Sequence, residues 1–448
     1  MSGIGLSVGL DLFPLLAATL ASVTCGLLGN FLVLRRLSLM GDAVSHSVLP
    51  GLVIAFLLAG TRSSLVMFAG AAAAGIATVL LVEIIKRLGR VEPGAAMGVV
   101  FSVLFALGVL LIETAAARQV DLDADCVLHG QLETLVWYGA PESLRSVFSL
   151  ETLRHTPRQV WTLLGVCVGS LLFVGVLFKE LRIAAFDAGL ATTLGFHAVW
   201  LHYALMIFVA GATVASFEAV GSILVIAMLV CPAATARLLT DRLGTQVMLS
   251  VAIAVVGTVA GYFGATWVPA LFGIDSVNAA GSMTVVSGVM LAAAVIGSPR
   301  YGMVARALRR RALRRTITRD DVVGAMFRAS ESGSAIESSN LDPLGLRVAE
   351  RDGLVTTRGG APRLTDRGQH FGAALMRRRR LWEGYLVDRA GLQADHVHAP
   401  AEVLEHLGLE PGAGAAPDEH GCPMPRADGT GLDDQGASGS GISDGSVR

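Results

Sequence analysis

Runs of apolar residues long enough to cross a lipid bilayer are the feature that most constrains how this chain can fold. A membrane-spanning helix takes roughly 20 predominantly apolar residues, because hydrocarbon offers no partner for an exposed backbone N–H or C=O group. Nine runs reach or approach that length: residues 11–34, 44–60, 65–85, 93–113, 160–178, 199–216, 220–239, 245–268 and 283–298. We therefore predict an all-α polytopic membrane bundle with about eight or nine transmembrane helices.

Composition changes near residue 300. The 448-residue chain is 53% hydrophobic and 16% charged, and its mean hydropathy of +0.61 lies well above that of soluble globular proteins. Beyond "GSPRYG" the sequence becomes polar and rich in arginine. We divide the chain into a transmembrane domain (residues 1–300), a basic juxtamembrane linker (301–315), a small α+β domain (316–426) and a disordered Gly/Ser/Asp-rich tail (427–448).

Arginine and lysine gather in short segments between the apolar runs, which predicts the orientation of the bundle. Such segments face the cytoplasm by the positive-inside rule, so we expect an extracytoplasmic N-terminus and a cytoplasmic C-terminal domain. A re-entrant or interfacial helix within residues 114–158 would reverse that parity. The basic run "RALRRRALRR" lies beside the membrane, where we expect it to meet anionic lipid head groups.

The lysines and cysteines exclude two kinds of site. The only lysines are Lys86 and Lys179, preceded by Ile85 and Phe178, so no GxxxxGK[ST] phosphate-binding loop can be written. Work driven by ATP therefore needs a separate subunit, and we expect no bond chemistry from this chain. The five cysteines are scattered without a CxxC pair, which predicts neither a disulfide framework nor a zinc cage.

Asp42 and His46 are ionisable residues in the apolar context "RRLSLMGDAVSHSVLPG". Residues four apart share one face of a helix, and a carboxylate with an imidazole suits a divalent transition ion. Pro50 also removes the backbone hydrogen bond to the carbonyl of His46, and ionisable residues at membrane depth are functional by default. The alternative from spacing alone is that Asp42 caps the helix and His46 is hydrogen-bonded inside the bundle.

Glu218, in "VASFEAVGS", is a further carboxylate at the mouth of a span. It either assists cations or faces water at a helix end.

Residues 316–426 contain the order helix, hairpin, helix. We expect Gly359 and Gly360 at the hairpin turn and Thr365 as the N-cap of a long second helix. This order is typical of a winged-helix domain. Further on, His398, Glu402, Glu405 and His406 fall along one helical stripe, which is either a divalent-metal site or a solvated charged face.

Three motifs in the first 300 residues carry a resemblance to a known family. "GLLGNFLVLRRLSLMGDAVSHSVLPG", "FDAGLATTLG" and "AVGSILVIAMLVCPAATARLLTDR" resemble the permease subunit of bacterial ABC transporters for zinc, manganese or iron. The resemblance implies that Asp42 and His46 line the metal path. It also implies that one segment docks on the ATPase subunit: Phe186, Asp187, Ala188, Gly189, Leu190, Ala191, Thr192, Thr193, Leu194 and Gly195. From composition alone, this segment is equally well an ordinary amphipathic connector.

The same resemblance implies the cargo, partners and location. The cargo would be a divalent transition metal, manganese, zinc or iron, with no covalently bound cofactor. The partners would be an ATP-binding cassette subunit, an extracytoplasmic metal-binding protein and a second permease, either the same chain or a related one. The location would be the bacterial inner membrane.

The C-terminal part is similar to metal-dependent repressors of the diphtheria-toxin-repressor type, through "ERDGLV", "LTDRG", "RRLWEGYLVDRAGL", "VHAPAEVLEH" and "DEHGCPMP". The resemblance carries metal ligands over to Glu383, His398, Glu402, Glu405 and His406. Two departures weaken it: Arg379 replaces a histidine ligand, and the segment before "LRVAERDGLV" is too short for an ordinary helix-turn-helix. We therefore do not expect DNA as a partner.

The sequence thus predicts a metal-importing permease subunit powered by a separate ATPase, with a tail that senses cytoplasmic metal. One alternative is a membrane-tethered, metal-dependent transcriptional regulator, which would require specific operator binding by the tail. Another is an ion-coupled carrier, which would transport metal without any ATPase.

Overall fold

The computed structural model describes residues 8–60, 64–116, 132, 135, 156–273, 277–334, 338–358, 361–393 and 396–406. The chain divides into two compact units, Met1–Ala305 and Arg306–Arg448. The predicted disordered tail (427–448) and the predicted turn at Gly359 and Gly360 lie outside the described residues, as does most of the segment 114–158.

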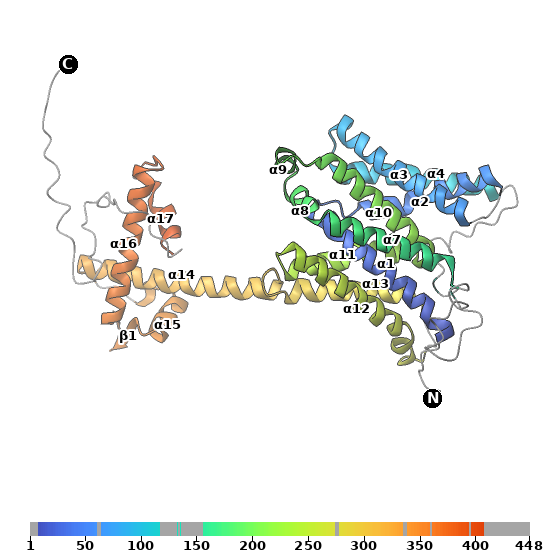
Figure 1. Ribbon diagram of the computed structural model, residues 1–448. Helices are drawn as coiled ribbons and strands as arrows, with labels where there is room; N and C mark the ends of the chain where they lie inside the picture. Colours follow the sequence, from blue (N-terminus) through green and yellow to red (C-terminus); the bar gives the residue numbers. More distant parts are fainter. Residues whose placement is uncertain are drawn as a thin grey trace, which may run out of the picture. The chain divides into compact units, whose positions relative to one another are not determined.

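Nine of the described helices are long and apolar enough to cross a membrane, which confirms the predicted bundle (Figure 1). They are α1 (Val8–Leu34), α2 (Met40–Ala59), α3 (Ser64–Gly89), α4 (Pro93–Ala116), α7 (Arg158–Val176), α10 (Ala198–Val220), α11 (Ser222–Leu239), α12 (Leu243–Ala270) and α13 (Ala279–Gly297). Two short helices, α8 (Phe178–Phe186) and α9 (Ala188–Thr193), connect α7 to α10.

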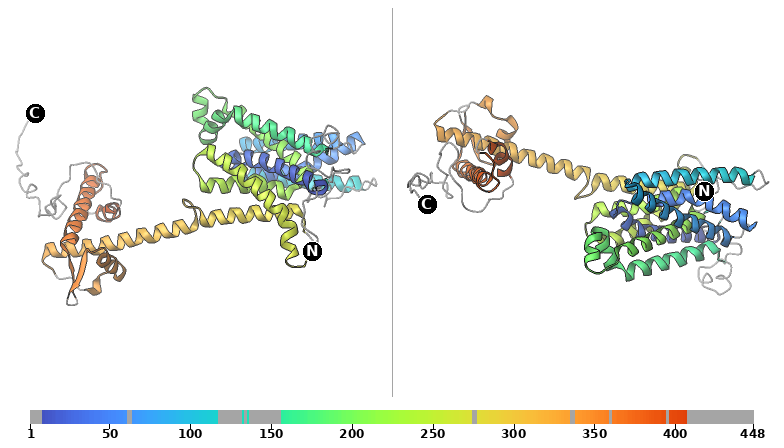
Figure 2. Two further views of the ribbon diagram at one scale, coloured as in Figure 1. Left: turned by 60° about the horizontal axis from the view of Figure 1, so that its bottom comes forward. Right: turned by 90° about the horizontal axis from the view of Figure 1, so that it is seen from above.

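Helix α1 is the central helix of the bundle, in contact with α7, α10, α11 and α12, and the two views of Figure 2 show it among them. In the apolar segment of α1, 67% of the residues are buried inside the structure, whereas the corresponding share is 22% in α4 and in α13. Lipid supplies no hydrophobic drive for helix association, so small residues that permit close backbone approach matter most. Gly29 is such a position, because a Cβ there would collide with the carbonyl of Leu229 in α11.

Buried polar side chains join α1 to α12. Gln246 donates from Nε2 to Oδ1 of Asn30 at 3.0 Å, and Ser250 donates to the carbonyl of Gly26 at 2.9 Å. Such interhelical hydrogen bonds fix the register of spans that lipid alone leaves free to slide.

The second unit has the predicted winged-helix order. Its elements are α14 (Met303–Ser332), a 3₁₀ turn (Ser338–Asn340), α15 (Pro343–Arg351), β1 (Val355–Arg358), β2 (Ala361–Leu364), α16 (Asp366–Asp388) and α17 (His398–Glu405). The strands pair antiparallel, with Val355 opposite Leu364. The residues predicted as a linker are helical from Met303 onward, because α14 continues into the domain.

Local capping sets the helix starts of this unit. Thr365 accepts a hydrogen bond from the amide of Gly368 at 3.0 Å, so α16 begins where the sequence predicts. Asp342 caps α15 in the same way, accepting from the amide of Gly345 at 3.1 Å. The unit also has a small apolar core, formed by residues of α14, α15 and β1 and their connections: Val322, Val323, Met326, Leu341, Ala349, Leu354 and Val355.

Candidate functional site

Helix α2 begins deep inside the bundle. Gly41 lies against the side chain of Leu229, near the middle of α11, and Val44 lies against Gly75, near the middle of α3. The first turns of α2 are therefore level with the middle of the neighbouring spans and not with their ends. Irregular backbone at such depth occurs only where protein or a cavity surrounds it; in the turn before α2, Leu37 is buried and Leu39 is 55% exposed.

Asp42 and His46 face each other on this part of α2. Nε2 of His46 lies 3.3 Å from Oδ1 of Asp42, and the two side chains are 23% and 34% exposed. Asp42 does not cap the helix, because the N-cap is Leu39 and no side chain caps α2. Helix α2 also continues through Pro50 without interruption.

Two aromatic rings of α4 flank the imidazole. The ring centroid of His46 is 5.1 Å from that of Phe101 and 5.7 Å from that of Phe105, which meets it edge-on. The rings pack against the imidazole that pairs with Asp42. Nothing in the sequence spacing indicated this contact between helices.

The pair supplies one oxygen and one nitrogen donor, fewer than a transition ion coordinates. Within the described residues no three His, Cys, Asp or Glu side chains are grouped so that they could hold a metal ion. Glu218, half-buried near the end of α10, is accordingly not part of such a group with Asp42 and His46. One copy of the described chain therefore offers an incomplete coordination shell.

An ion-pair network that the sequence did not reveal joins α1, α3 and α10. Arg35 donates to Nδ1 of His202 at 3.0 Å, and Nε2 of His202 lies 3.6 Å from Glu83. Glu83 also pairs with Lys86 at 3.2 Å and with Arg87 at 2.7 Å. The spacing of Glu83 to Lys86 and Arg87 on one helix was visible, whereas His202 carries no local signal.

The segment predicted to dock on an ATPase forms an exposed corner of the bundle. Asp187 caps α9 by accepting hydrogen bonds from two backbone amides at 2.8 and 3.0 Å. Phe186, Leu190 and Leu194 are 63%, 51% and 55% exposed, while Ala191 is fully buried. Helix α9 and the residues on either side of it, from the end of α8 to Leu194, thus present an apolar row that the described part of the chain leaves uncovered.

The predicted metal ligands of the tail fall into two groups. In the first group, Glu383 pairs with the imidazole of His398 at 2.9 Å and with the guanidinium of Arg379 at 3.3 Å. Arg379 also approaches Glu402 at 3.9 Å. Because a permanent cation occupies these carboxylates, this group does not fit a bound metal ion.

The second group surrounds His406, which is buried at the end of α17. Nδ1 of His406 lies 3.4 Å from Asp320, and Nε2 lies 3.4 Å from Asp321. Burial raises the pKa of Asp321, and His406 opposes that rise. The sequence did not indicate that either aspartate contacts His406, because both lie on α14, more than 80 residues away. The side chain of the predicted ligand Glu405 is outside the described residues.

Comparison with known proteins gives two family matches. Residues 12–137 and 151–298 match the ABC 3 transport family. Residues 365–408 match the iron dependent repressor, metal binding and dimerisation domain.

Three similar proteins are named for manganese or zinc transport. The manganese transport system membrane protein MntD of Bacillus subtilis is 40% identical over 290 residues, 65% of this chain and 92% of that protein. The zinc transport system membrane protein TroD of Treponema pallidum is 40% identical over 299 residues, 67% and 77% of the two chains. The manganese transport system membrane protein MntC of Bacillus subtilis is 30% identical over 418 residues, 88% and 89%, so this similarity extends into the tail. The chain therefore belongs to the ABC 3 transport family and carries a C-terminal domain of the iron-dependent repressor type.

Proposed function

We propose that this chain is the permease subunit of an importer of divalent transition metal ions. A separate ATPase drives it, an extracytoplasmic binding protein delivers the metal, and a second permease, the same chain or a related one, completes the path. The proposal includes a bacterial inner-membrane location with the C-terminal domain in the cytoplasm. Manganese and zinc in the names of the relatives support this cargo class, and the pair of Asp42 and His46 carries the proposal.

The proposed role of the pair is to replace part of the water around the travelling ion. A carboxylate and an imidazole 3.3 Å apart bind manganese, zinc and iron alike, and two ligands hold an ion weakly enough to release it. A twofold-related permease would bring a second pair to the same axis and complete the shell. Glu218 is proposed as an outer carboxylate that attracts cations toward the path.

We propose that the ATPase subunit binds at α9 and thereby couples ATP hydrolysis to movement of the bundle. The exposed Phe186, Leu190 and Leu194 form an apolar surface for a groove of the ATPase. Helix α10 follows α9 directly, and the pairing of His202 with Arg35 connects the start of α10 to the turn that leads into α2. The ATPase would then bias two conformations of the bundle through its differential contacts with them.

The tail is proposed to restrain transport in response to cytoplasmic metal. Arg379 takes the place of a metal ion in the first group, so metal would act at the second group, through Glu405 and His406. No three of the described ligands are grouped for an ion, so binding requires these side chains to converge. The exposed arginines in the first half of α14 would contact anionic lipid head groups.

Removing either donor of the proposed path should lower transport. Asp42→Asn and His46→Phe should each reduce manganese, zinc or iron uptake by about 10–100-fold, measured with competing ions in proteoliposomes containing the complete transporter. His46→Phe retains an aromatic ring against Phe101, so a histidine that only packs would tolerate it. His370→Phe, at an exposed position of α16, is the control, and normal uptake by His46→Phe would contradict the proposal.

A charge in the apolar row of α9 should disconnect the ATPase. Leu190→Asp should lower co-purification of the ATPase subunit by about tenfold or more, because burying an unpaired carboxylate in an interface costs several kcal/mol. Leu392→Asp makes the same change at a 40%-exposed leucine of the tail. If Leu190→Asp retains full ATPase binding and metal-stimulated ATP hydrolysis, α9 is not the docking element.

Replacing Arg379, whose guanidinium pairs with Glu383, should create a metal site in the tail. Arg379→His should add about one bound Mn²⁺ or Zn²⁺ per chain, because it supplies a third donor beside Glu383 and His398 and frees Glu383 from the guanidinium. Metal content after dialysis measures the gain. Arg378→His, one residue earlier on α16, should add none; an unchanged metal content in Arg379→His would show that the guanidinium does not take the place of an ion.

Deleting the tail tests its regulatory role separately from transport itself. A chain lacking residues 316–448 should still import metal, but uptake should no longer fall when cytoplasmic metal is high. The measurement is the initial uptake rate in vesicles preloaded with manganese. An unchanged response to preloading would remove the sensing proposal and leave the transport proposal intact.

A further inference from the structure

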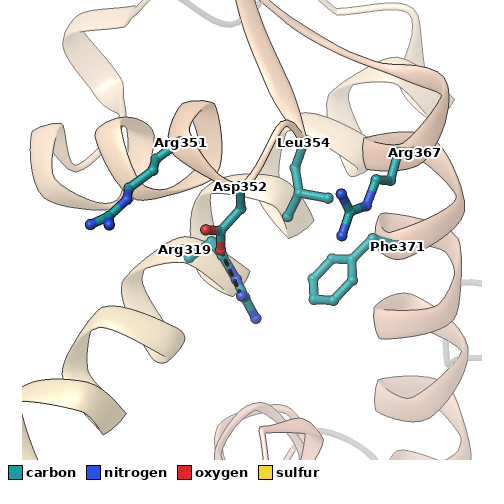
Figure 3. A pocket seen from close by; sticks show the side chains of 6 residues that line it. All are labelled: Arg319, Arg351, Asp352, Leu354, Arg367 and Phe371. Carbon is teal, nitrogen blue, oxygen red and sulfur yellow. Dashed lines mark hydrogen bonds and ion pairs between the residues drawn. The ribbon is translucent and has the colours of Figure 1, made fainter.

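The tail unit contains a cavity that belongs to neither group of predicted metal ligands. Its volume is about 360 Å³, at the lower end of the range for small-molecule pockets, about 300–1,000 Å³. Figure 3 shows its lining residues: Arg319 from α14, Arg351 and Asp352 at the end of α15, Leu354 before β1, and Arg367 and Phe371 from the first turns of α16.

The positive charge of this cavity is only partly balanced. Arg319 donates to Asp352 at 2.9 Å and to Asp320 at 2.8 and 3.0 Å. Burial lowers the pKa of Arg319, but these two carboxylates outweigh it and raise the pKa overall. Arg351 and Arg367, by contrast, form no hydrogen bond or ion pair with any described residue. Two arginines that line the cavity therefore have no counter-ion among the residues that the structure describes.

One wall of the cavity is apolar. The guanidinium carbon of Arg319 lies 5.0 Å from the ring centroid of Phe371, a distance typical of a cation–π contact. Leu354 is buried beside it, and Figure 3 shows the side chains of Arg367 and Phe371 directed toward the same space. The cavity thus combines free cationic groups with an aromatic surface.

We propose that this cavity binds a small molecule that carries a phosphate group beside a planar ring, such as a nucleoside monophosphate. The planar fork of arginine donates two parallel hydrogen bonds to a phosphate. Arg367 already points toward the space beside Phe371, and Arg351, which Figure 3 shows directed away from it, would turn inward to join it. The ring of Phe371 and the side chain of Leu354 would accommodate the base. A bound phosphate would offset the repulsion among the three arginines and connect α14, α15 and α16.

The size of the cavity favours a small molecule over nucleic acid. A duplex presents its phosphates along a convex backbone, whereas this site is a hollow of about 360 Å³ with an apolar wall. The site also differs from the arginine-rich first half of α14, where no described aromatic wall accompanies the charge. The proposal does not depend on the transport role of Asp42 and His46.

Calorimetry on the full chain in lipid nanodiscs tests the proposal, with AMP, inorganic phosphate, adenosine and glycerol 3-phosphate as probes. We expect one AMP per chain, bound more tightly than phosphate, with adenosine weaker than AMP. Arg351→Gln and Arg367→Gln should each weaken AMP binding by about tenfold, as expected for one charge-assisted hydrogen bond. Arg347→Gln removes the same charge from α15 outside the cavity and should bind AMP normally.

The other outcomes separate the sources of phosphate. Glycerol 3-phosphate binding as tightly as AMP, and weakened by the same variants, would retain the phosphate site and assign it to a lipid-type head group. No binding of any phosphate compound at millimolar concentration would overturn the proposal, as would binding that is unchanged in both variants. Binding of duplex DNA that the variants weaken, without AMP binding, would overturn it in favour of a nucleic-acid contact.

Discussion

Close backbone packing among α1, α2 and α11 is the constraint on which the rest of the membrane unit depends. A Cβ at Gly29 would collide with the backbone carbonyl of Leu229, and a Cβ at Gly41 would displace the Cδ1 methyl of the same leucine. The chain turns after α1 and starts α2 level with the middle of α11.

Asp42 and His46 follow that turn directly and are therefore level with the middle of the neighbouring spans, not with their ends. A carboxylate at the end of a span faces water at little cost, but the same group at mid-depth must be paired or line a polar passage. Asp42 has His46 at 3.3 Å, and both side chains remain partly exposed. Such a partly exposed pair of oxygen and nitrogen donors is compatible with the proposed metal path.

The tail illustrates how one substitution changes the chemistry of a retained fold. The winged-helix order, the caps of α15 and α16 and the small apolar core are all present. Arg379, however, adds a fixed positive charge beside Glu383, where a metal-binding domain would need a neutral donor. Arg379 pairs with Glu383 and approaches Glu402, so the charge of both carboxylates is balanced within the chain.

The sequence by itself determined the nine spans, the change of composition near residue 300, the start of α16 at Thr365 and the family motifs. These features are local: an apolar run of about 20 residues or a capping residue acts within its own segment. The spacing of Asp42 and His46 likewise placed them on one face, because both lie on one helix. Sequence also indicated that Arg379 disturbs the first tail group, since the replacement is visible at a single position.

Only the tertiary structure decided what these residues meet. The mid-depth start of α2, the rings of Phe101 and Phe105 on His46, and the pairing of His202 with Arg35 all join helices that are distant along the chain. The same holds for the contacts of His406 with Asp320 and Asp321, and for the three arginines around one cavity. Such contacts follow from helix packing, which depends on the shapes of many side chains at once and leaves no periodic signal in any one segment.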